Sequence, residues 1–177
     1  MWATTEGSPS GRYGDAMTAD LDIIAEQQRR LRFPVFDEHT AWKLGSDLRR
    51  RAGDLGVAVT IEIRLAGATV FLNAMPGTAP ANADWARRKR NVVEQLQRPS
   101  YAVGLEAAHD GRSVLDEMGL DPRDVAAHGG AFPIVVEGVG CVGVATVSGL
   151  PQRDDHTLVV EALAEHCAID LEGARLS

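Results

Sequence analysis

The sequence predicts a mixed α/β fold of the α+β kind, a single domain in which an antiparallel sheet of two hairpins is flanked by helices. Two pairs of β-rich runs, each joined by a short turn that contains glycine, predict the hairpins. Runs with the helical spacing of apolar residues precede, separate and follow these pairs. A chain of 177 residues, 45% of them hydrophobic, is long enough to bury one core.

The charge balance limits the partners that we expect. The net charge is -7 at pH 7, so we expect no nucleic acid partner, because such a partner needs a broad basic face. No apolar run is long enough to span a bilayer and no secretory pattern opens the chain, so we expect a cytoplasmic protein without a membrane partner. Cys141 and Cys167 lie in a strand-like and a helix-like run, which favours free thiols over a disulfide.

The N-terminal part divides into a tail and two helices. Residues 1–17 are rich in Gly, Ser and Thr without an apolar period, so we expect a disordered tail before a domain over residues 18–177. Helical spacing predicts a first helix over 18–33 and a second over 37–55. His39, in the first turn of the second helix, is a candidate cap, neighbour contact or ligand to a site.

The strands follow from a change in period. Residues 57–64 alternate between apolar and polar side chains, which predicts a strand with one wet face. A loop that contains Gly67 leads into a second strand over 69–74. The later hairpin is expected from the runs 131–137 and 141–148. The last of these runs is almost wholly apolar, which is typical of a central strand covered on both faces.

A helix predicted over residues 82–97 carries Trp85 and Lys89 on its apolar stripe. A lysine in that position either stretches along apolar surface or serves a pocket. Arg90 belongs to a run of arginines that fans around the helix, so a local anion site and a solvated cationic face are both open. Short helices follow, and the last helix begins near residue 152. The expected short helices span 101–108, 113–118 and 122–126, and in the last helix we expect His156 on the surface and His166 in packing.

One turn before the third strand is the centre of the candidate site. His128 is followed by Gly129 and Gly130, with Pro133 three residues further on. Adjacent glycines let the backbone take positive φ or approach a guest closely, and proline fixes the shape of the turn. The turn is either the rim of a ligand site or only a tight turn with an exposed histidine.

Four separated stretches together resemble the heme-degrading-domain superfamily, also called GlcG/HbpS-like, in its cytosolic branch. They read FDEHTAW at 36–42, NADWARRKRNVV at 82–93, AHGGAFPI at 127–134 and VSGLPQRDDH at 147–156. The resemblance implies a profilin-like fold, assembly as a symmetric homo-oligomer and, in some relatives, heme binding. The helix lysine of the family pattern matches Lys89, its Gly-Gly-x-x-Pro turn matches Gly129, Gly130 and Pro133, and its Ser-Gly matches Ser148 and Gly149.

The leading hypothesis is therefore a protein that binds heme, another tetrapyrrole or a small anion, with heme as cofactor and possible assistance in heme degradation. Heme needs an axial donor, an apolar slot and cations for its propionates. His128, the candidate metal ligand, or His39 supplies the donor; Lys89 and Arg90 supply cations, and Trp85, Gly129 and Gly130 complete the site. Two alternatives stay open. One is a non-enzymatic oligomeric assembly factor, and the other is a small-molecule enzyme that uses Lys89 and His128.

Overall fold

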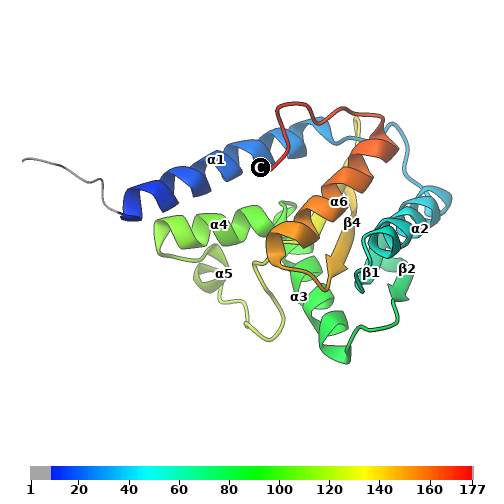
Figure 1. Ribbon diagram of the computed structural model, residues 1–177, viewed down its shortest axis with the longest axis horizontal. Coiled ribbons are helices and arrows are strands. Elements are labelled where there is room, and N and C mark those ends of the chain that lie inside the picture. The colour runs from blue at the N-terminus through cyan, green and yellow to red at the C-terminus, as the bar shows by residue number, and fades with distance from the viewer. Residues whose placement is uncertain (1–8, 177) are drawn as a thin grey trace, which may run out of the picture.

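A computed structural model describes residues 9–176 and contains a four-stranded antiparallel sheet with the strand order β2-β1-β4-β3 (Figure 1). The strands are β1 (Thr60–Leu65), β2 (Ala68–Ala74), β3 (Ala131–Val136) and β4 (Gly140–Ser148). β1 pairs with β2 and β3 pairs with β4, so both predicted hairpins are confirmed. The hairpins join through the antiparallel pairing of β1 with β4, which makes β4 a central strand as predicted.

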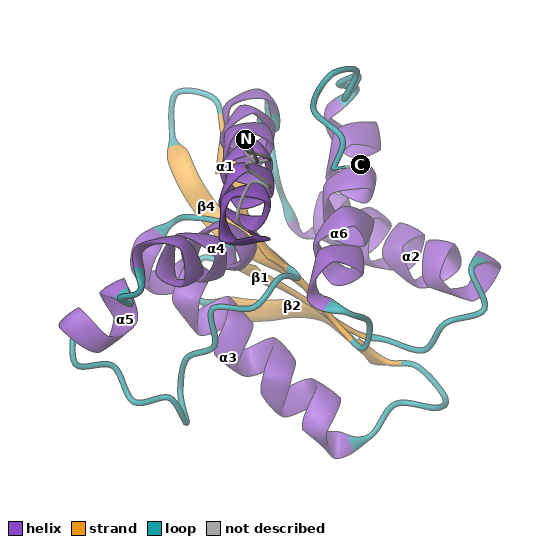
Figure 2. Ribbon diagram, turned by 60° about the vertical axis from the view of Figure 1, so that its left-hand side comes forward, coloured by secondary structure: helices purple, strands orange, loops and turns teal. Residues whose placement is uncertain are grey.

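Helices cover both faces of this sheet (Figure 2). Figure 2 shows α3 (Pro80–Leu96) on one face, and α2 (Glu38–Asp54) and α6 (Gln152–Cys167) on the other. The alternation along β4 accounts for this division, since Val147 belongs to the core beneath α2 and α6, whereas Val144 packs against Val93 of α3. The predicted α+β fold, a sheet of two hairpins flanked by helices, is confirmed.

The first helix, α1 (Pro9–Arg30), packs against α4 (Ser100–Asp110) rather than standing free (Figure 1). It begins at Pro9, so the disordered tail predicted for residues 1–17 is wrong from Pro9 onward, and residues 1–8 lie outside the described residues. Met17 and Leu21 pack against a buried cluster formed by Ile24 of α1 with residues of α4, so tertiary contacts support this part of the helix. α5 (Val114–Glu117) follows as predicted, whereas residues 122–124 form a turn instead of a helix.

The predicted wet face of β1 is covered, which corrects the sequence interpretation. Thr60 is 1% exposed and Glu62 is 7% exposed. Arg90 of α3 donates to both carboxylate oxygens of Glu62 at 2.9 Å. Arg90 therefore neutralises the buried carboxylate of Glu62. Both faces of β1 are covered, although apolar and polar side chains alternate along it.

His156 is buried, contrary to the surface position that its place near a helix start predicts. It is 1% exposed, and its Nε2 lies 2.9 Å from Oε1 of Gln27 on α1. The rings of Tyr101 and Phe132 lie 5.3 and 5.9 Å from its ring. Burial lowers the pKa of His156 to about 3, because the charged imidazolium loses its hydration. His156 thus ties α6 to α1 as a neutral side chain.

We expect His156 to make the fold sensitive to acid. Because its pKa falls from 6.5 to about 3 on folding, the unfolded chain binds more protons between these values, and stability declines as the pH drops through them. The limiting slope for one group is about 1.4 kcal/mol per pH unit. His156→Gln keeps a donor for Gln27 without this titration. Urea unfolding should show the stability advantage of the wild type over the variant shrinking between pH 7 and pH 4, and a constant difference would contradict the prediction.

Candidate functional site

A cavity of about 250 Å³ opens at the end of the sheet where β4 runs into α6. Its walls come from α3, from the turn before β3 and from the connection between β4 and α6. The lining residues are Asn82, Trp85, Lys89, His128, Ser148, Gly149, Leu150, Gln152 and Asp155. The structure therefore brings Trp85, Lys89 and His128 together, although the sequence left open whether Lys89 and His128 share a pocket.

The floor of the cavity is a buried ion pair that joins the two helical layers. Nζ of Lys89 on α3 lies 2.7 Å from Oδ2 of Asp155 on α6, and the two side chains are 5% and 0% exposed. The ammonium also donates to the carbonyl of Val147 at 3.3 Å. Asp155 accepts backbone hydrogen bonds from Leu150 at 3.0 Å and Gly149 at 3.3 Å.

This pairing decides the role of Lys89. Burial lowers the pKa of Lys89 and raises the pKa of Asp155, and the attraction between the two charges opposes both shifts. Of the two positions open to the lysine, the structure places it in a pocket. Asp155 balances its charge there, and Lys89 as a heme contact stays a prediction. The sequence interpretation missed Asp155 as its partner.

The glycines of the turn approach the protein's own backbone. A Cβ on Gly129 would lie 1.9 Å from the carbonyl oxygen of Gln152. Gly130 has a φ of +123°, and a Cβ on it would lie 2.3 Å from the carbonyl oxygen of Val147 and 3.0 Å from Nζ of Lys89. Because they lack a side chain, both glycines let the turn pack closely against β4 and α6 over the ion pair. The sequence predicted a close approach of this turn to a ligand, and the structure shows a close approach to the protein's own backbone.

His128 lies at the mouth of the cavity on a fixed turn. Ser100 Oγ donates to the His128 carbonyl at 2.5 Å and accepts from the Ala131 amide at 3.1 Å. The His128 ring is exposed and meets the Trp85 ring edge-on, with centroids 4.9 Å apart. Burial of part of the ring and the positive charges of Lys89 and Arg88 lower the pKa of His128, so the imidazole is neutral at pH 7.

Trp85 also holds a cation. The Arg88 guanidinium carbon lies 3.9 Å from the centroid of the Trp85 ring, within cation–π range, and Arg88 pairs with Asp84 at 2.9 Å.

Two other predicted site residues lie outside this cavity. Arg90 is engaged with Glu62, and His39 is exposed in the first turn of α2; neither lines this cavity. His39 and Arg90 as heme contacts remain predictions.

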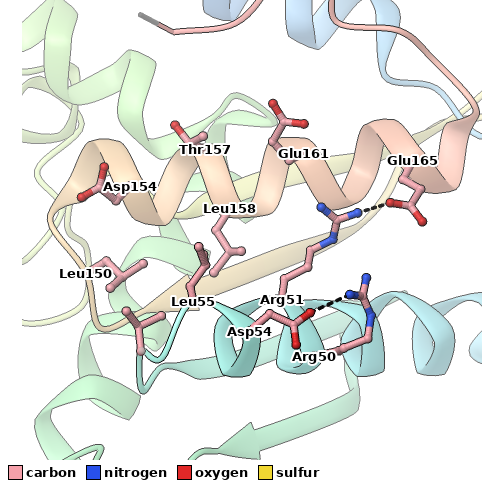
Figure 3. Close-up of a pocket in the computed structure, with 11 residues that line it drawn as sticks. Arg50, Arg51, Asp54, Leu55, Leu150, Asp154, Thr157, Leu158, Glu161 and Glu165 are labelled. Carbon is pink, nitrogen blue, oxygen red and sulfur yellow. Dashed lines mark hydrogen bonds and ion pairs between the residues drawn. The ribbon is translucent and has the colours of Figure 1, made fainter.

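A second hollow, of about 670 Å³, lies between α2 and α6 (Figure 3). Leu55, Leu150 and Leu158 point into it from three sides, and an ion pair between Arg51 and Glu165 crosses one end (Figure 3). The described residues that line it include no histidine, cysteine, methionine or tyrosine, which are the usual axial ligands of heme iron. The hollow is roomy and has leucines at its centre, but charged side chains surround them and none of its described lining residues is a usual heme ligand.

A family model described as haem degrading protein HbpS-like matches residues 36–164. The chain belongs to this family. Among the relatives of this HbpS-like protein is a UPF0303 protein of Azotobacter vinelandii, 59% identical over 145 residues that cover 82% of this chain and 87% of the relative. The residues that line the 250 Å³ cavity all lie within the matched range, so the site belongs to the family domain.

Solved structures share the fold of this HbpS-like protein at low identity. The crystal structure of Ybr137w protein superposes with a TM-score of 0.76 at 24% identity, covering 84% of this chain and 87% of that one. The crystal structure of a PduOC:heme complex gives a TM-score of 0.63 at 20% identity, covering 73% and 94%. These likenesses confirm the fold that the resemblance implied.

Two further searches concern residues 9–176. No helix in this range is long and apolar enough to cross a membrane. No three or more His, Cys, Asp or Glu side chains in this range lie together in a way that could hold a metal ion.

Proposed function

We propose that this HbpS-like protein binds heme or a related tetrapyrrole, with His128 as the axial ligand. The observation that carries the proposal is the exposed imidazole of His128 beside Trp85 at the mouth of the cavity, and the lowered pKa of His128 favours its neutral form. Neutral imidazole is the form that coordinates iron. The hydrogen bond from Ser100 fixes the backbone of His128, so a ligand would meet a donor that is held in place.

The residues around His128 fit such a ligand in part. Trp85 offers an aromatic surface, and Arg88, whose guanidinium lies over that ring and pairs with the exposed Asp84, supplies positive charge toward propionates at the mouth of the cavity. The 250 Å³ cavity lies below the range of about 300–1,000 Å³ that is usual for enclosed ligands of drug size. A tetrapyrrole would therefore need cover from a second copy of the chain, and we propose that the protein acts as a homo-oligomer.

Binding rather than turnover is the function that the site supports. Heme would supply a redox-active iron, whereas this chain supplies a nitrogen donor, an aromatic contact and positive charge. The enzyme alternative gains from the shared cavity of Lys89 and His128. However, the ammonium of Lys89 is held by Asp155 and is no free nucleophile, so we do not assign a reaction to it. The family description and the heme-bound relative of the same fold support a heme-related role.

Heme titration followed by absorbance tests the proposal. We expect a saturable Soret band in the wild type and an affinity lower by more than about tenfold, or about 1.4 kcal/mol, in His128→Ala, because this variant lacks the axial donor. His109→Ala removes an exposed histidine of α4 outside the cavity and should bind like the wild type. His39→Ala tests the other predicted donor. Unchanged binding in His128→Ala, or loss confined to His39→Ala, would overturn the assignment of His128.

A further inference from the structure

We propose that the inner part of the cavity is a separate binding site for a small carboxylic acid, held by Lys89 and Ser148. This site lies beneath His128 and takes a ligand far smaller than heme, so the inference does not rest on heme binding. It follows from two hydrogen-bond donors left over at the cavity floor, from the sign of the local charge and from the size of the space.

The first donor is the ammonium of Lys89. An ammonium has three N–H groups. Within residues 9–176, two of them are accounted for by Asp155 at 2.7 Å and by the carbonyl of Val147 at 3.3 Å. Because Lys89 lines the cavity, its third N–H is available to a ligand there. A lysine already paired with one carboxylate is well placed to bridge to a second.

The second donor is the hydroxyl of Ser148 at the end of β4. Ser148 is only 3% exposed and lines the same cavity, on the side of the sheet that α3 covers. Its Oγ makes no hydrogen bond to any other residue in the described part of the chain, and it is open to the cavity rather than sealed from it. A hydroxyl in a cavity wall takes its partner from the molecule that fills the cavity. A ligand atom in the cavity would supply that partner.

The local charge favours an anion over a cation. The ion pair at the floor is neutral overall, and two backbone amides also donate to Asp155. The positive charges of Lys89 and Arg88 are felt at His128, where they lower its pKa. The 16-residue helix α6 starts at Gln152 in the cavity wall, so the positive end of its dipole faces the same space. The charges of Lys89 and Arg88 and the dipole of α6 attract negative charge, whereas the ion pair as a whole is neutral.

The volume sets the size of the ligand. At ~30 Å³ for each water of the liquid, 250 Å³ corresponds to about eight water molecules. A carboxylic acid with a few carbons fills such a space, and Trp85 offers an apolar wall for its carbon chain. The carboxylate would accept from Lys89 and Ser148 together, as charge-assisted hydrogen bonds of this type are the strong ones.

Calorimetric titration with pyruvate, lactate and malonate, together with NMR of the His128 ring, tests this site. We expect saturable binding of at least one acid, with a rise in the pKa of His128 as negative charge enters beside it. Lactamide, which lacks the charge, and ethanolamine, which has the opposite charge, should not bind. Binding of ethanolamine in place of the acids, or no response of His128 to any acid, would overturn the proposal.

Ser148→Ala distinguishes specific binding by hydrogen bonds from non-specific electrostatic attraction of anions. It removes the hydroxyl without disturbing the ion pair, and we expect affinity for the acid to fall by about tenfold, as the loss of a hydrogen bond to a charged group implies. Ser46→Ala changes an exposed serine of α2 outside the cavity and should leave affinity unchanged. Equal affinity in both variants would overturn the site. Heme titration of the wild type fails or succeeds independently, so the two proposals are separable.

Discussion

Replacing Asp155 with alanine is expected to destabilise the protein by about 3–5 kcal/mol, because the change leaves the Lys89 ammonium buried without its counter-ion. Both side chains are at least 95% buried, as their exposed fractions of 5% and 0% state. The amides of Gly149 and Leu150 also lose their acceptor, so the connection between β4 and α6 loosens. The effect exceeds that of an ordinary surface ion pair, which contributes about 0–1 kcal/mol.

Urea unfolding at pH 7 measures this cost, and a neighbouring residue supplies the control. Asp154→Ala removes an exposed carboxylate from the same helical turn and should change stability by less than about 0.5 kcal/mol. The double variant Lys89→Met with Asp155→Ala should cost less than the sum of its single variants, because neither charge is then left alone. Additive costs, or equal costs for Asp154→Ala and Asp155→Ala, would show that the pair is not a coupled unit.

The periodicity of the sequence was sufficient to predict the sheet. Alternating and wholly apolar runs are local signals, and they identified both hairpins and the central position of β4. The helical spacing of Trp85 and Lys89 likewise placed them on one stripe of α3, and both line the cavity. Local pattern therefore predicted the strands and the apolar stripe of α3, but not the burial of Thr60, Glu62 and His156.

The partners of buried polar residues could not be predicted in the same way. Asp154 and Asp155 are adjacent carboxylates in the first turn of one helix, and only the packing of α6 against the end of the sheet turns Asp155 toward Lys89. Glu62 and His156 are buried because Arg90 and Gln27 reach them from other layers. Such pairs join residues that are 28 to 129 positions apart in the sequence. The spacing of apolar residues within one helix or strand therefore cannot predict them.

Gly130→Ala is expected to cost about 2–6 kcal/mol, the sum of a backbone and a packing contribution. The backbone contribution arises because φ is +123°, a value that an L side chain rarely adopts. The packing contribution arises because the new methyl group would lie 2.3 Å from the carbonyl oxygen of Val147, which is a fixed strand atom, and 2.9 Å from Cβ of Asp155.

Gly138→Ala separates these two contributions and shows why the Gly-Gly turn belongs to the site. Gly138 also has positive φ, at +71°, but a Cβ there meets nothing within 4 Å, so its substitution should carry only the backbone cost of about 1–3 kcal/mol. Thermal and urea unfolding should therefore show a larger loss for Gly130→Ala than for Gly138→Ala. Equal losses would contradict a packing role for Gly130. A larger loss for Gly130→Ala would mean that the turn can pack against Lys89 and Asp155 only because Gly130 has no side chain. The turn that carries His128 and the buried ion pair would then form one packed unit.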